Sequence, residues 1–109
     1  MIVKSESKRW AGSVTVYDQL TLPQVELIEA ALEPVETDKD GRYFLTAKDK
    51  KVIPALLACV EKWDLQNFPQ PAALETWPMT PRKESHELID TIWRAVLLVY
   101  QGEQDIPNA

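Results

Sequence analysis

The chain has 109 residues, of which 45% are hydrophobic and 27% are charged, so its composition is that of a folded globular protein. Its 12 basic and 17 acidic residues give a net charge of −5, which disfavours a protein that tracks nucleic-acid phosphates. The single cysteine excludes a disulfide framework and the usual multi-cysteine zinc site. We expect one globular domain over residues 1–102 and a frayed polar tail over residues 103–109.

The chain carries no predicted targeting or membrane segment. Its first ten residues, MIVKSESKRW, lack the apolar stretch of a signal peptide. The longest apolar run covers residues 52–60, far short of the ~20 residues that a bilayer-spanning helix needs. We therefore expect a soluble protein that is not secreted and resides in a reducing compartment, without membrane contact.

The first predicted element is a strand within residues 10–17. Val14 and Val16 share one face there, and polar or amphipathic residues alternate with them, which is the period of a half-buried strand. A strand needs a partner. The first choice is 42–46, which follows an Asp-Gly turn signal, and residues 2–3 are the second choice.

A helix is predicted to begin after Thr21. Thr21 is a suitable N-cap, and Gln24, three residues later, completes a capping box. Pro23 is compatible with the first turn, and Pro34 is expected to end the helix.

The next predicted helix covers roughly residues 47–63. Its apolar residues recur at helical spacing, and Trp63 lies on that apolar face. Pro54 either kinks this helix or occupies the first turn of a shorter helix that begins near Val52, and the shorter helix is the favoured interpretation.

The last predicted helix begins with Thr80 as N-cap and Pro81 at its first position, and it ends at a left-handed Gly102. Leu97 and Leu98 make its second half apolar nearly all round. Such a helix is either central in its domain or gives one face to another chain. The predicted fold is therefore α+β and mainly α, with a small sheet near the N-terminus, about three helices and the last helix central.

The segment 62–78, which we call the strap, reads KWDLQNFPQPAALETWP and is unusually rich in proline and aromatic residues. We expect Trp63 to anchor the strap to the preceding helix, and the core to contain Trp63 and Trp93. Two interpretations of the strap remain open: a lid folded over the helices, or a stiff extended surface that binds a partner. The candidate partner-binding residues are Phe68, Trp77, Leu97 and Leu98.

The sequence offers little chemistry. His86 is the only histidine and is predicted to be a solvated helix residue, and Cys59 is predicted to be a buried, unreactive hydrophobe. Residues 36–41 have the acidic spacing of a calcium loop, but Ala47 stands where the loop needs its bidentate glutamate. We therefore predict no catalytic residue, cofactor or metal, and no enzymatic activity.

Several segments together resemble a known family: residues 10–14, 20–24, 60–65 and 92–103, with the prolines that follow residue 65. Their order is similar to that of the small tail-assembly chaperones of long-tailed bacteriophages and prophages. The resemblance implies a non-enzymatic protein of the infected bacterium's cytoplasm. Such proteins hold the long tape-measure protein while tail-tube subunits polymerise around it, and they are absent from the finished tail. Many of their genes also give a longer, frameshifted product.

Two other classes of function stay open at this point. One is a small acidic adaptor or inhibitor that binds a single folded partner, unrelated to tail assembly. The other is an enzyme with a site that carries no recognisable motif. The partners expected from the resemblance are tape-measure and tail-tube proteins, with self-association as a further possibility and no nucleic acid.

Overall fold

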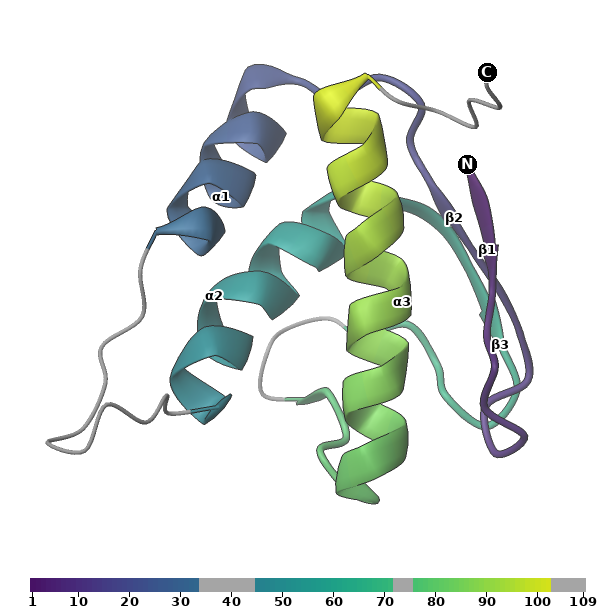
Figure 1. The fold of residues 1–109 in the computed structure, drawn as a ribbon. Coiled ribbons are helices and arrows are strands. Elements are labelled where there is room, and N and C mark those ends of the chain that lie inside the picture. Colours follow the sequence, from purple (N-terminus) through teal and green to yellow (C-terminus); the bar gives the residue numbers. More distant parts are fainter. Residues whose placement is uncertain (34–44, 72–75, 103–109) are drawn as a thin grey trace, which may run out of the picture.

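The computed structural model describes residues 1–33, 45–71 and 76–102, which form a small sheet and three helices (Figure 1). The last helix is long and central, with α1 and α2 on one side of it and the sheet on the other. The predicted fold class is confirmed. The elements in chain order are β1 (Ile2–Lys4), β2 (Gly12–Val16), α1 (Leu22–Leu32), α2 (Leu45–Ala58), β3 (Val60–Leu65) and α3 (Arg82–Gln101).

The sheet is antiparallel and its strand order is β1-β2-β3. The strand predicted within residues 10–17 is confirmed as β2, and residues 2–3 do pair with it, because Val3 lies opposite Val14. The first-choice partner, 42–46, is wrong in the part that the structure describes, since Leu45 and Thr46 begin α2. Residues 42–44 lie outside the described residues.

The second neighbour of β2 corrects the prediction of a helix over 47–63. The helix ends at Ala58, and Val60–Leu65 forms β3, in which Trp63 lies opposite Val14. Apolar residues near the end of this range fit a helical and a two-residue period equally well, and the free edge of β2 decides between them. Trp63 is therefore a strand residue, and its predicted place on the helix was wrong.

Gly12 allows β2 and β3 to approach closely. Its backbone has φ +134°, a conformation that other residues rarely adopt, and it lies opposite Leu65. A Cβ atom at this position would overlap the carbonyl oxygen of Asp64.

Helix α2 contains Pro54 in its interior, so the favoured shorter helix beginning near Val52 is wrong. Proline removes one helical hydrogen bond and disfavours the preceding turn. The neighbouring side chains of Ile53, Ala55 and Leu56 are fully buried. Their burial offsets the local cost of the proline.

The N-terminus of α1 is capped as predicted. The backbone N–H of Thr21 donates to Gln24 Oε1 at 2.6 Å, and Gln24 Nε2 donates to the carbonyl oxygen of Ala58 at 2.8 Å. The same glutamine thus caps its own helix and fastens α1 to the end of α2. Ile28 and Ala31 are the buried residues of α1.

Helix α3 ends as predicted, because Gly102 is left-handed with φ 77°. Its start differs by one residue: Pro81 is the N-cap, rather than Thr80. Trp93, like Trp63, is half-buried and packs against the core cluster, so both predicted core tryptophans lie at the margin of the core. The buried residues of α3 are Ser85, Leu88, Ile89, Ile92, Ala95, Val96 and Val99.

Candidate interaction surface

The aromatic residues of the strap pack against one another and against Trp10. The ring of Phe68 lies 4.9 Å from that of Trp10, 5.0 Å from that of Trp63 and 5.2 Å from that of Trp77, between ring centroids. The Trp63 and Trp77 rings are 5.7 Å apart. Edge-on and tilted contacts at these separations are favourable for aromatic pairs. We call Trp10, Trp63, Phe68 and Trp77 the aromatic cluster.

Hydrogen bonds fix the two strap tryptophans within this cluster. Trp63 Nε1 donates to the backbone oxygen of Phe68 at 2.7 Å, which turns the chain back just after β3. Trp77 Nε1 donates to Ser85 Oγ at 3.1 Å, and Ser85 is completely buried in the first turns of α3. Each buried indole N–H is therefore satisfied, which removes the main cost of burying tryptophan.

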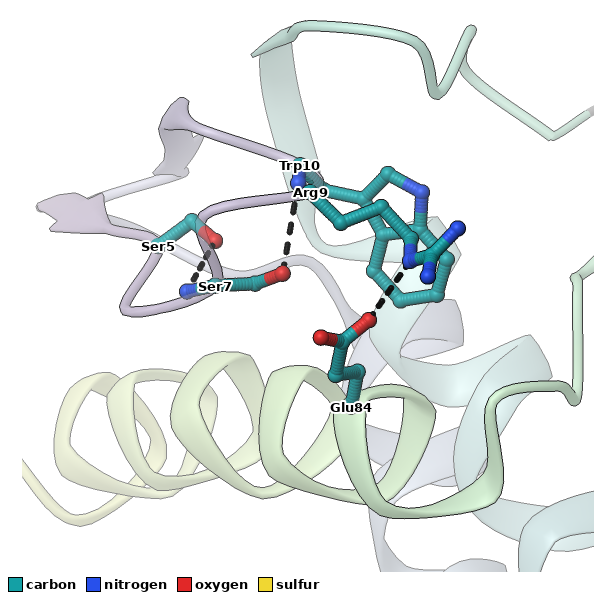
Figure 2. Close-up of polar contacts among 5 residues, drawn as sticks. All are labelled: Ser5, Ser7, Arg9, Trp10 and Glu84. Atoms are coloured by element: carbon teal, nitrogen blue, oxygen red, sulfur yellow. Dashed lines mark hydrogen bonds and ion pairs between the residues drawn. The ribbon is translucent and has the colours of Figure 1, made fainter.

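The loop between β1 and β2 brings Trp10 into the cluster. Figure 2 shows two serine contacts in this loop: Ser7 N–H donates to Ser5 Oγ, and Trp10 N–H donates to Ser7 Oγ, both at 3.2 Å. Arg9 Nε lies 2.8 Å from Glu84 Oε2, so an ion pair joins the loop to the first turn of α3 (Figure 2). The loop, the strap and α3 thus meet around the cluster.

The strap residues proposed for partner binding are buried inside the protein. Phe68 and Trp77 each expose 3% of their surface. Of the two interpretations of the strap, the lid over the core agrees with this burial. A partner that contacted these rings would first have to open the cluster.

The other two candidate residues lie near the end of α3 and are more accessible. Leu97 is half-buried, and Leu98 is exposed at 37%. Trp93 and Tyr100 are also only partly covered. Residues 95–101 contain no charged side chain, so the charged group found beside this part of α3 comes from another helix: Glu29 of α1 accepts a hydrogen bond from the Tyr100 hydroxyl.

Sequence reasoning missed the largest exposed apolar residues of the helices. Leu22 exposes 71% of its surface, Leu32 50% and Leu27 39%, and all three belong to α1. Leu27 lies one turn from the buried Ala31, and Leu32 lies one turn from the buried Ile28, so both leucines border the covered face of α1. Leu22 lies away from that face.

The titratable residues examined for chemistry lie apart from this surface. Cys59 is fully buried, and burial raises the pKa of its thiol from 9.0 to about 11. It therefore behaves as the small hydrophobe that the sequence predicted. His86 is half-buried, so its prediction as a fully solvated residue was wrong.

Among residues 1–33, 45–71 and 76–102, no group of three or more His, Cys, Asp or Glu side chains has the arrangement of a metal site. The acidic stretch 36–41 that was compared with a calcium loop lies outside the described residues. In the same described ranges, no helix combines the length and apolar character needed to cross a bilayer.

No protein-family model, curated protein or solved structure matches this chain. The resemblance to tail-assembly chaperones therefore stays a prediction.

Proposed function

We propose that this protein is a non-enzymatic tail-assembly chaperone of a long-tailed bacteriophage or prophage. In this role it binds the tape-measure protein in the cytoplasm of the infected cell and assists tail-tube assembly around it. One observation carries the proposal: large apolar side chains stay exposed on α1 and α3 although the protein's own aromatic cluster is closed. Exposed apolar surface of this kind is typical of a protein that binds another protein.

The end of α3 supports the proposal because it is apolar and accessible at once. Leu98 is exposed, and Leu97 and Tyr100, which lie three residues apart on a different side of the helix, are partly covered. A helical segment of a tape-measure protein would bind such a surface through apolar residues at helical spacing. Phe68 and Trp77, which were proposed for the same contact, are replaced in this role by residues of α1 and α3.

The alternative function is a small acidic adaptor or inhibitor that binds a folded partner unrelated to tails. The same exposed leucines favour it, since they indicate a protein partner without identifying it. The gene neighbourhood separates the two, because a chaperone gene is expected just before a very long, helix-rich reading frame.

Co-expression with the product of that neighbouring frame tests the proposal. We expect the two proteins to co-purify, and we expect Leu98→Ser to reduce the recovered complex at least threefold. Ile2→Ser is the matched control, because Ile2 is also exposed, at 71%, but lies on β1. Absence of a complex with the wild-type chain would contradict the proposed function and favour the adaptor.

A further inference from the structure

Helix α1 has one covered side and one uncovered side. It packs against α2, and its covered side contains Ile28 and Ala31. Leu22 lies on the uncovered side and exposes 71% of its surface, and Leu32 lies at the border of the covered side and exposes 50%. An exposed leucine on a free helix surface leaves apolar area in water that a partner would remove.

The same helix is acidic and has no compensating base. Glu26, Glu29 and Glu33 are all exposed, and no Lys or Arg occurs from residue 10 to residue 33. Like charges three and four residues apart on a helix repel each other. Glu29 and Glu33 also lie near the C-terminal end of α1, where the helix dipole disfavours negative charge.

No ion pair within the described residues involves these glutamates: the ion pairs found there include Met1 with Asp18 and Arg9 with Glu84, both away from α1. Glu29 accepts a hydrogen bond from the Tyr100 hydroxyl at 3.0 Å, but that donor is neutral. The surface of α1 therefore combines exposed leucines with three glutamates that have no ion-pair partner among the described residues.

We propose that this surface, made of Leu22, Glu26, Glu29, Leu32 and Glu33, binds a basic amphipathic helix of a partner protein. Leu22, Glu26, Glu29 and Glu33 follow one line along α1 at spacings of four, three and four residues, with Leu32 beside them. A partner helix of about three turns spans this length, at about 1.5 Å per residue. Apolar residues near the two ends of the partner helix cover Leu22 and Leu32, and Lys and Arg residues between them pair with the glutamates.

This inference adds the charge and shape of the partner to the proposed function, and it rests on that function only for the partner's identity. The acidic surface disfavours two other occupants. A second copy placed α1 against α1 would bring Glu29 close to like charges. An anionic membrane surface would repel the same residues.

The test uses a synthetic 18-residue helical peptide that carries leucines near both ends of one face and lysines between them, and a second peptide with glutamates in place of those lysines. Binding to the full chain is measured by fluorescence anisotropy at low and high salt. We expect the lysine peptide to bind with an affinity that falls as salt rises, and the glutamate peptide to bind at least tenfold more weakly.

Variants locate the binding. We expect Glu26→Lys/Glu33→Lys to lower the affinity for the lysine peptide at least tenfold. We expect Leu22→Ser/Leu32→Ser to lower it at least fivefold. Glu29 is left in place because it accepts the bond from Tyr100. The control Glu61→Lys/Glu87→Lys makes the same change in net charge at exposed positions of β3 and α3 and should weaken binding less than threefold.

Two outcomes overturn the inference. One is that the lysine peptide does not bind. The other is that the α1 and control charge variants lose affinity for the peptide equally, which would indicate general charge attraction. Circular dichroism of each variant confirms that it is folded.

If the peptide binds at α1 but the tape-measure protein does not co-purify, the inference is supported and the proposed function fails. If the tape-measure protein co-purifies equally with wild type and both α1 variants, the inference fails and the proposed function stands.

Discussion

The strap and α1 both carry large apolar side chains, but they use them in opposite ways. In the strap, Phe68 and Trp77 are buried in the aromatic cluster, and their polar groups are satisfied within the chain. In α1, Leu22 and Leu32 expose half or more of their surface. The comparison teaches that apolar content alone does not locate an interaction surface. What matters is whether another part of the same chain covers the residue.

The difference has a structural cause. The strap begins within β3 and leads to α3, and two other parts of the chain meet its rings: the β1–β2 loop and the first turns of α3. Helix α1 is packed mainly on α2, and the far side of a helix that is covered from one direction stays open. Two predictions test this contrast and a third tests the burial of Cys59, and they are given from the largest expected effect to the smallest.

Truncation of Trp77 should destabilise the aromatic cluster. Trp77→Ala removes a buried ring from the aromatic cluster and leaves Ser85 without its indole partner, so we expect a loss of about 3–5 kcal/mol in the free energy of unfolding. Urea denaturation measures it. Trp93→Ala is the matched control, because Trp93 is only half-buried, and we expect a smaller loss. A loss for Trp77→Ala below about 1 kcal/mol would show that the strap does not close over the core.

The sequence predicted much of this fold where one local signal dominates. The capping box at Thr21 and Gln24 and the left-handed Gly102 depend on neighbouring residues alone, and both are present in the structure. The alternation in β2 was equally clear. Such features are set by hydrogen bonds and dihedral angles that a short stretch of sequence determines.

Features that depend on distant contacts were not predictable in the same way. Val60–Leu65 was predicted as the end of a helix, and only the presence of β2 beside it makes it a strand. The burial of Phe68 requires Trp10, which lies far away in the sequence, and Trp77 is held by Ser85 of the following helix. Phe68 and Trp77, two of the four candidate partner-binding residues, are buried in the structure because tertiary contacts decide the path of the strap.

Ionisation of Cys59 should weaken the core as pH rises. Burial raises the pKa of this thiol from 9.0 to about 11, so the unfolded chain loses the proton first. The stabilising contribution is fully present below pH 9 and is lost as pH rises to about 11. We expect the wild type to lose on the order of 2 kcal/mol relative to Cys59→Ala over this interval, at about 1.4 kcal/mol per pKa unit. Parallel pH profiles of the two proteins would contradict the burial of the thiol.

The smallest expected effect concerns the open side of α1. Leu22→Ser replaces a residue that exposes 71% of its surface at the first position of the helix, so little packing is lost and the capping box remains. We expect a change of less than about 0.5 kcal/mol in the free energy of unfolding. Ile28→Ala is the matched control on the covered side of the same helix, where removal of buried methyl groups should cost about 2–5 kcal/mol.

Chemical denaturation of both variants gives the contrast directly. A near-zero change for Leu22→Ser together with a large one for Ile28→Ala means that Leu22 contributes little to the fold, so its exposed surface is free to serve a partner. If Leu22→Ser instead destabilises the chain as much as Ile28→Ala does, another part of the protein covers Leu22 in solution. The open side of α1 would then belong to the core, as the strap does, and the contrast between the two regions would disappear.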